Sequence, residues 1–223
     1  FFDLKLDTSV KIRKSIIAFS EKYFSGIGGG NNLPACLTYG QQMAGRHTHS
    51  TTNFIYKTVN IKHIIQKTRY VIVGGVATRY YMPERFTIDM DILILPENTK
   101  QLHKELKEAG YEKASSLAIG GSTWNNKKGG VIDVIELEEE WVEEAVQHPN
   151  FFDKNLPVIA LPYLVLMKLK SGRVQDIADI SRMLGLADEE ALKKVKVLIS
   201  RYLPSAYEDL KSLVTLGKLE WRK

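Results

Sequence analysis

The sequence is poor in two features that mark other protein classes, namely paired cysteines and long apolar runs. Cys36 is the only cysteine among 223 residues, so the chain forms no internal disulfide and no cysteine metal cage. No apolar run reaches the roughly 18 residues of a membrane-spanning helix. A charged-then-apolar leader is also missing, so we expect no membrane association and no secretory signal. These absences predict a globular protein of the reducing cytoplasm.

The positive charge is concentrated in the first third of the chain. Residues 1–69 carry ten Lys or Arg and three Asp or Glu, a net charge of +7, whereas the remaining residues carry −2. A basic excess of this kind fits a nucleic-acid backbone as partner. A solvated basic surface explains it equally simply.

Two aspartates, Asp89 and Asp91, interrupt the apolar stretch RFTIDMDILI at 85–94. Side chains two apart on a β-strand stand on the same face, separated by roughly 6 to 7 Å. Both carboxylates would therefore face one place, while Ile88 and Met90 face a core. Close carboxylates repel each other, and burial makes their ionisation harder still unless a cation compensates. The stretch therefore predicts a divalent-metal site.

Alternating short apolar stretches and helical patterns predict an α/β (α+β) fold, with a mixed β-sheet flanked by helices and a helical C-terminal part. Strands are expected at 70–75, 88–95, 110–119 and 129–137, and helices at 8–24, 57–67, 76–82, 98–109, 138–146, 163–170, 175–184, 188–201 and 204–216. Asn98 is expected to cap its helix and Gly110 to end it. Three regions follow: a basic helical and loop extension at 1–60, an α/β core at 61–160 and a helical region at 161–223.

Two features of the first region are weak site candidates. Gly28–Gly30 are followed by neither a Gly-Lys-Ser/Thr pattern nor a helix, so a phosphate loop is not predicted there. His47 and His49 lie in a polar stretch with no third ligand nearby, and they are expected to be solvated rather than metal-bound.

A third carboxylate, Asp133, lies in another apolar stretch, VIDVIEL at 131–137. If its strand pairs beside the strand of Asp89 and Asp91, three carboxylates meet, enough to hold one or two Mg²⁺ ions that also bind substrate phosphates. Upstream, Gly74 and Gly75 end a strand and open a short helix. Glycine lets backbone N–H groups approach a phosphate closely, and a helix N-terminus favours its negative charge.

The order of strand, Gly-Gly, short helix and Asp-x-Asp, in VIVGGVATRYYMPERFTIDMDILI, resembles the nucleotidyltransferase superfamily that includes DNA polymerase beta. Together with the later LPYLVLMKLKSGRVQDIADISRML, it is most similar to the AbiEii-type and related minimal nucleotidyltransferases of toxin–antitoxin and phage-defence systems. The resemblance covers residues 68–186. It implies a nucleotidyltransferase-type sheet, two Mg²⁺ ions with Mn²⁺ as a substitute, and a nucleoside triphosphate as substrate.

The resemblance also implies the site residues. The catalytic and metal-binding residues would be Asp89, Asp91 and Asp133. The nucleotide-binding residues would be Gly74, Gly75, Thr78, Arg85, Thr87, Lys168 and Arg173. Lys168 matches the lysine that family members direct toward the phosphates, and Arg173 is a second candidate. Val76 departs from the serine found close by in many members, and this leaves open how the β- and γ-phosphates are held.

Some of these residues have simpler explanations. Asp176 and Asp179 lie three apart on one helix face, and pairing with nearby basic residues, namely Lys170, Arg173 or Arg182, would account for them. Arg85 and Thr87 stand at a strand entry, although Thr87 shares the face of Asp89 and Asp91.

The implied reaction is attack of a hydroxyl on the α-phosphate of a nucleoside triphosphate, with release of pyrophosphate. The acceptor suggested by the toxin-like members is a tRNA 3′ end or another RNA. Related members instead transfer AMP to a partner toxin or antitoxin protein, and others modify small molecules such as aminoglycosides. A non-catalytic binding module on the same fold and a metal-dependent glycosyltransferase are the remaining alternatives. The sequence leaves the base preference, the oligomeric state and the role of residues 1–60 open.

Overall fold

The computed structural model describes residues 61–83, 87, 89–152 and 156–222. The predicted extension at 1–60, with its helix at 8–24, its glycines and its two histidines, lies outside the described residues, as does Arg85. The division into three regions therefore stays a prediction.

The described residues form strands and helices in an alternating order followed by helices alone. The strands are β1 (Val71–Ile72), β2 (Met90–Ile94), β3 (Tyr111–Ser116), β4 (Gly121–Asn126), β5 (Val131–Glu136), β6 (Asn150–Phe152) and β7 (Leu156–Val158). The helices are α4 (Ile61–Ile64), α5 (Gly74–Tyr81), α6 (Thr99–Glu108), α7 (Glu140–Gln147), α8 (Leu161–Ser171), α9 (Val174–Leu186), α10 (Glu189–Tyr202) and α11 (Tyr207–Glu220), with 3₁₀ turns η1 (Pro96–Asn98) and η2 (Pro204–Ala206). The predicted mixed sheet with a helical C-terminal part is confirmed.

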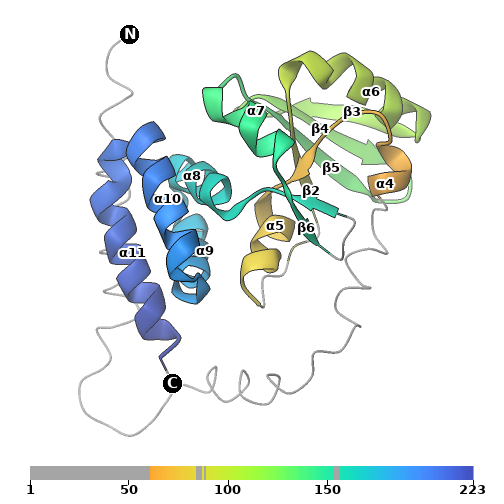
Figure 1. The fold of residues 1–223 in the computed structure, drawn as a ribbon. Coiled ribbons are helices and arrows are strands. Elements are labelled where there is room, and N and C mark those ends of the chain that lie inside the picture. Colours follow the sequence, from red (N-terminus) through yellow and green to blue (C-terminus); the bar gives the residue numbers. More distant parts are fainter. Residues whose placement is uncertain (1–60, 84–86, 88, 153–155, 223) are drawn as a thin grey trace, which may run out of the picture.

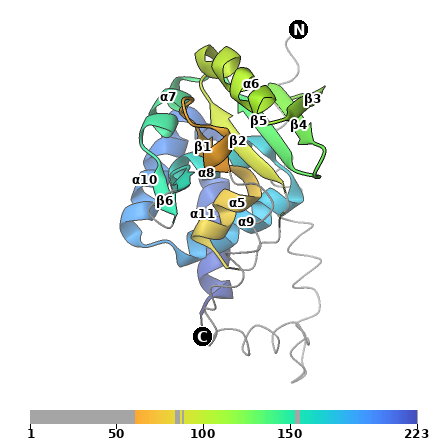
Figure 2. The same cartoon turned by 90° about the vertical axis from the view of Figure 1, so that its right-hand side faces the viewer.

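The strands form a seven-stranded mixed sheet in the order β3-β4-β5-β2-β1-β7-β6. Figure 2 shows them side by side, from β3 and β4 at one edge to β6 at the other. The central strand β2 pairs in parallel with β5 and antiparallel with β1. The middle of the sheet is covered on both faces, so residues of the central strands such as Ile92, Leu93 and Val134 are fully buried.

Helix α6 covers the face of the sheet that carries Trp124. The ring of Trp124 lies 4.8 Å from that of His103, measured between centroids, and Leu102 and Leu106 of α6 are fully buried. Trp124 is paired in register with Ile132, and Ile132 with Met90, so these side chains share the α6 face. Side chains one residue along each strand point to the opposite face.

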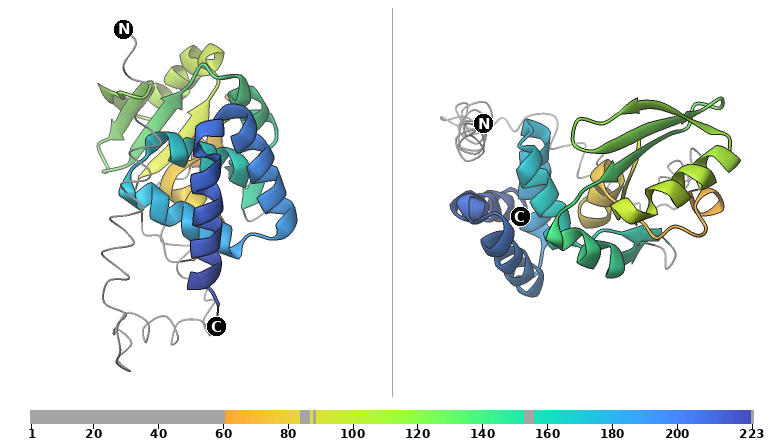
Figure 3. Two further views of the ribbon diagram at one scale, coloured as in Figure 1. Left: turned by 90° about the vertical axis from the view of Figure 1, so that its left-hand side faces the viewer. Right: turned by 90° about the horizontal axis from the view of Figure 1, so that it is seen from above.

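Helices α8 to α11 gather on one side of the sheet (Figure 1). Helix α8 packs against α9 and α10, and α11 packs against α9, while α5 contacts both β2 and the pair α8 and α9. Seen from above, α5 lies between the sheet and these helices (Figure 3). The N-terminal end of α5 is therefore held between the sheet and the helical region. In the part of the chain that is described, no helix is both long and apolar enough to cross a membrane.

In its described part, the helix predicted at 57–67 is confirmed only at Ile61–Ile64, and the prediction for 65–67 is wrong, because α4 ends at Ile64. The carboxylate of Glu105 accepts hydrogen bonds from the backbone N–H groups of Gln66 and Lys67, at 2.7 Å each, and of Thr68 at 3.1 Å. A side chain distant in sequence thus supplies the acceptors that a continued helix would have supplied. Burial raises the pKa of Glu105, but these hydrogen bonds outweigh burial and lower it overall.

One further prediction is wrong, and three strands are additional to those predicted. Asn98 stands at the N-cap of α6 but makes no side-chain cap bond, because it closes the turn η1 with φ −88° and ψ −5°, outside the extended region that a capping residue needs. The strands β4, β6 and β7 were not predicted. The polar sequence GSTWNN of β4 lacks the β-branched run that indicates a strand, and its burial comes from the neighbours on both sides.

Candidate active site

The two strands that carry Asp91 and Asp133 lie side by side. β2 and β5 are parallel neighbours, and Asp91 is the register partner of Asp133. Residues directly opposite on adjacent strands share a face, so both carboxylates stand on the face opposite α6. The condition set in the sequence analysis, that these two strands pair, is met.

The start of helix α5 packs directly against Asp91. Gly74 has φ +59°, and a Cβ at this position would lie 1.8 Å from Oδ2 of Asp91. The backbone N–H of Gly75 donates a hydrogen bond to the Asp91 carboxylate, and a Cβ on Gly75 would lie 2.7 Å from Cβ of Thr87. Both glycines are therefore required here, because any side chain would displace Asp91 or Thr87.

Electrostatics at this pair disfavour two negative charges. Burial and the nearby carboxylate of Asp133 raise the pKa of Asp91 to about 6, with a smaller contribution from Asp89. The hydrogen bond from Gly75 and the charge of Arg173 act in the opposite direction. Oδ1 of Asp133 is buried and has no hydrogen-bond partner among the described residues. A buried carboxylate oxygen without a donor is costly.

The donor chemistry of the pair fits a hard divalent cation. Carboxylate oxygens are the ligands that Mg²⁺ prefers, and a cation would relieve both the raised pKa of Asp91 and the unsatisfied Oδ1 of Asp133. Over the described ranges, no group of three or more His, Cys, Asp or Glu side chains is arranged to hold a metal ion. The structure thus brings two of the three predicted carboxylates together, and a site of three stays a prediction.

The other candidates from the same stretch lie around this pair. Asp89 is exposed and comes one residue before β2, near enough to raise the pKa of Asp91. Thr87 is partly buried against Gly75. Thr78 is fully buried, and its hydroxyl donates to the carbonyl of Gly74 at 2.8 Å. The Thr78 hydroxyl therefore stabilises the first turn of α5.

Lys168 lies in a buried ionic cluster. Its ammonium donates to Oδ1 of Asp176 and to Oδ2 of Asp179, each at 2.8 Å, and all three side chains are at most 7% exposed. Ser171 and Gln175 complete the cluster, with hydrogen bonds to Asp176 at 2.8 Å and to Asp179 at 3.1 Å. The ammonium of Lys168 thus sits between two carboxylates of its own protein.

Arg173 links this cluster to the carboxylate pair. Its Nε donates to Oδ2 of Asp176 at 2.6 Å, while 76% of its side chain is exposed. The hydrogen bond to Asp176 raises the pKa of Arg173, and Asp91 adds to the rise. Burial by itself raises the pKa of Asp176, but Arg173 and Lys168 outweigh burial and lower it. Arg173 therefore presents a permanent positive charge within the field of Asp91.

Two parts of the site were missed from the sequence. Lys168 was not expected to pair with Asp176 and Asp179, although Gly172, with φ +62°, ends α8 and turns α9 back onto it. That glycine is the signal that could have shown the pairing. Thr123 is the register partner of Asp133 on β4 and shares its face. Thr123 can be placed beside Asp133 only once β4 is known to be a strand, and the polar sequence of β4 does not indicate one.

The comparisons with known proteins find structures and no sequences. Neither a protein-family profile nor a curated protein sequence matches the chain. The solved structures that are similar include ANT(2″)-Ia in complex with adenylyl-2″-tobramycin, with 12% identity over 77% of this chain and 99% of that chain and a TM-score of 0.42. They also include the lincosamide antibiotic adenylyltransferase LnuA bound to lincomycin, with 15% identity, coverage of 69% and 97%, and a TM-score of 0.38.

A third similar structure is the CCA-adding enzyme with CTP, at 13% identity and a TM-score of 0.33, covering 79% of this chain and 49% of that chain. All three TM-scores lie below 0.5, so the function is inferred from the residues of the site itself.

Proposed function

We propose that the chain is a metal-dependent nucleotidyltransferase that moves a nucleoside monophosphate from a nucleoside triphosphate to a hydroxyl of RNA. The observation that supports this best is the in-register pair Asp91 and Asp133, set against the Gly74-Gly75 start of α5. Phosphoryl transfer needs carboxylates for a divalent cation beside backbone N–H groups for phosphates, and this arrangement offers both.

Asp91 and Asp133 would hold the cation, with Asp89 as the nearest further carboxylate. A divalent ion such as Mg²⁺, when bound, lowers the pKa of an attacking hydroxyl and neutralises charge on the triphosphate. Asp133, whose Oδ1 has no donor among the described residues, would accept the proton of the acceptor hydroxyl. The use of two ions and the replacement of Mg²⁺ by Mn²⁺ remain predictions.

The triphosphate would lie between the start of α5 and Arg173. Since Arg173 is exposed and within the field of Asp91, it is the better candidate for offsetting triphosphate charge. Lys168 would act indirectly, by holding Asp176, which in turn orients Arg173. The acceptor oxygen would attack the α-phosphorus, and the bond to the bridging oxygen of pyrophosphate would break.

RNA is the acceptor that the charge distribution favours, because residues 1–69 carry a net charge of +7. AMP transfer to a partner protein and modification of a small molecule remain the alternatives. The narrower predictions, a toxin–antitoxin partner and a cytoplasmic location, belong to the same proposal and depend on the acceptor that is found.

The test incubates the purified chain with Mg²⁺ and each α-³²P-labelled nucleoside triphosphate. Parallel reactions contain total tRNA, a cell lysate or no acceptor. Label on RNA supports the proposal. Label on a protein would show that the chain is a nucleotidyltransferase whose acceptor is protein rather than RNA. Asp133→Asn is the inactive control, because it removes the charge and keeps the shape.

Glu97→Gln is the matched variant, since it removes one exposed carboxylate beyond the far end of β2. The proposal would be overturned if the unaltered chain transfers no label and binds no triphosphate in a Mg²⁺-dependent manner. It would leave a binding module on this fold.

A further inference from the structure

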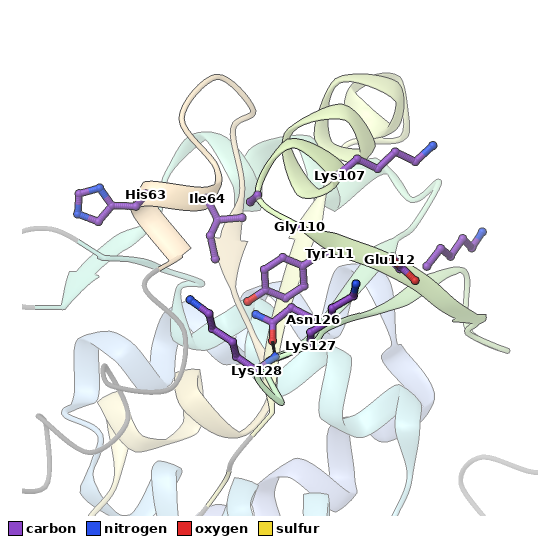
Figure 4. A pocket seen from close by; sticks show the side chains of 11 residues that line it. His63, Ile64, Lys107, Gly110, Tyr111, Glu112, Asn126, Lys127 and Lys128 are labelled. Atoms are coloured by element: carbon purple, nitrogen blue, oxygen red, sulfur yellow. Dashed lines mark hydrogen bonds between the residues drawn. The ribbon is translucent and has the colours of Figure 1, made fainter.

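A basic hollow of about 820 Å³ lies away from the carboxylate pair, between α4, the end of α6, strand β3 and the turn after β4. Figure 4 shows Tyr111 and Asn126 in its middle, with Lys127 and Lys128 on the turn below. Asn126 lies two residues after Trp124 on β4 and therefore shares the α6 face. The hollow and the carboxylate pair are on opposite faces of one sheet.

The charge of the hollow is strongly positive. Four exposed lysines line it, namely Lys107, Lys113, Lys127 and Lys128, against the single lining carboxylate of Glu112. None of the four lysines forms an ion pair with another described residue. Burial lowers the pKa of His103 and Glu136 opposes this, while Lys113 and Lys107 lower it further. The positive field therefore extends into the protein around α6.

The turn that carries two of these lysines is held in a defined shape. Oδ1 of Asn126 accepts hydrogen bonds from the backbone N–H groups of Lys128, at 2.9 Å, and Gly130, at 2.8 Å. Gly129 has φ +81°, which suits the tight turn, and its N–H donates to the carbonyl of Asn126 at 3.1 Å. Lys127 and Lys128 thus project from an ordered turn, and less entropy is lost when they bind a ligand.

We propose that this hollow binds the phosphodiester backbone of the acceptor RNA, an inference that rests on the proposed function. The hollow is too large for one phosphate and presents several ammonium groups, which contact phosphates without reading bases. The sequence before α4, whose residues His63 and Ile64 also line the hollow, is itself basic.

The position of the hollow relative to the carboxylates suits a strand of RNA. Lys128 precedes Asp133 by five positions, so the Cα atoms of the two lie at most roughly 17 Å apart. An RNA that crosses the end of the sheet at the Lys127–Lys128 turn would reach both faces. Its backbone would be held at the hollow while its terminal hydroxyl approaches Asp133.

The test measures binding of a fluorescein-labelled single-stranded RNA by anisotropy at increasing KCl, with no nucleotide and no Mg²⁺. Lys127→Gln with Lys128→Gln is expected to weaken binding at low salt about tenfold, and changing all four lysines to weaken it about a hundredfold. The slope of log affinity against log salt should shrink by about 0.7 for each phosphate that the variant no longer neutralises.

The matched control is Lys193→Gln with Lys194→Gln, an adjacent exposed pair on α10 that removes the same charge. Equal loss of binding in both double variants would mean that only net charge matters and would overturn the inference. Polyglutamate bound as tightly as RNA, with the same dependence on the four lysines, would overturn it in favour of an acidic protein partner.

Failure of this inference can be distinguished from failure of the proposed function, because the RNA-binding assay requires no catalysis. If the chain transfers nucleotides but its RNA binding does not depend on the four lysines, the inference about the hollow is wrong and the proposed enzymatic function stands. If RNA binding depends on the four lysines but the chain transfers no nucleotide to any acceptor, the hollow is an RNA site and the proposed enzymatic function is wrong.

Discussion

Two groups of partly or fully buried aspartates lie in different parts of the molecule, and their charges are compensated differently. Asp176 and Asp179 on α9 are neutralised by the ammonium of Lys168, with Ser171, Arg173 and Gln175 around them. The pair Asp91 and Asp133 on β2 and β5 forms no ion pair with a lysine or arginine among the described residues. Asp91 accepts from the backbone N–H of Gly75, and an oxygen of Asp133 is left without a hydrogen-bond partner in the same ranges.

The difference separates two carboxylates that serve the fold from a pair for which the protein supplies no counter-charge. A buried carboxylate that the protein satisfies with its own cation contributes to a fixed structure. A pair of carboxylates held together without one opposes folding, and the cation that we propose for this site would offset that cost. Removing the charges of each group one at a time tests this contrast.

The largest effect is expected from removing one charge of the unsatisfied pair. Asp133→Asn should lower the rate of nucleotidyl transfer by at least about a thousandfold, because a cation ligand and a proton acceptor are lost together. The melting temperature should stay the same or rise, since a like charge next to Asp91 is removed. Transfer rates and thermal unfolding of the same preparation check this. A drop in melting temperature of several degrees would place Asp133 among the structural carboxylates.

The reverse behaviour is expected in the satisfied group. Lys168→Met leaves Asp176 and Asp179 buried without their cation and should destabilise the protein by about 3 to 5 kcal/mol. Urea unfolding measures the change. Combining Lys168→Met with Asp176→Asn and Asp179→Asn should recover much of the loss, because no uncompensated charge remains. If Lys168→Met instead keeps full stability and only weakens triphosphate binding, Lys168 contacts the phosphates directly.

Much of this architecture could be predicted from residue patterns. Gly74-Gly75 at the start of a short helix, and the apolar runs around Asp91 and Asp133, could be recognised locally, because hydrophobic periodicity and turn-forming residues depend on few neighbours. The pairing of β2 with β5 could be posed only as a condition, since a lone carboxylate in an apolar strand indicates a nearby partner without naming the strand that carries it. The helices α8 to α11 were placed within a few residues by their apolar periodicity.

What could not be predicted depends on contacts distant in sequence. β4 is polar and becomes a strand only because β3 and β5 flank it. The helix expected through Lys67 ends early because Glu105, nearly forty residues away, captures its N–H groups. Lys168 was assigned to phosphate from a resemblance, while its buried partners are set by how α9 folds back on α8. Local pattern cannot report such tertiary partners.

The pH dependence of stability should sharpen the contrast further. Because the pKa of Asp91 is raised to about 6, the folded metal-free chain binds this proton more tightly than the unfolded chain does. Stability is therefore lost as the pH rises from near 4 through 6. Asp91→Asn removes this loss, so the variant should gain roughly 2 to 3 kcal/mol over the unaltered chain between pH 4 and pH 8.

Urea unfolding in EDTA at several pH values measures this gain, with Glu97→Gln as the control for loss of an exposed carboxylate. Two parallel stability curves for Asp91→Asn and the unaltered chain would mean that Asp91 titrates normally. Adding Mg²⁺ should stabilise the unaltered chain and leave Asp91→Asn unchanged, because the cation replaces the proton.

The smallest effect is expected at Arg173, which pairs with Asp176 of one group and is close enough to Asp91 of the other to affect its pKa. Its side chain is mostly exposed, so losing the bond to Asp176 in Arg173→Gln should cost less than about 1 kcal/mol of stability. Its charge lies in the field of Asp91, so the KM for the triphosphate should rise about tenfold with little change in kcat, as expected for a residue that binds phosphates equally in the ground and transition states. Arg173→Lys should restore part of the affinity, since the charge returns without the planar guanidinium. An unchanged KM in Arg173→Gln would assign Arg173 to the ionic cluster of α9 alone, and the two groups of aspartates would then be independent.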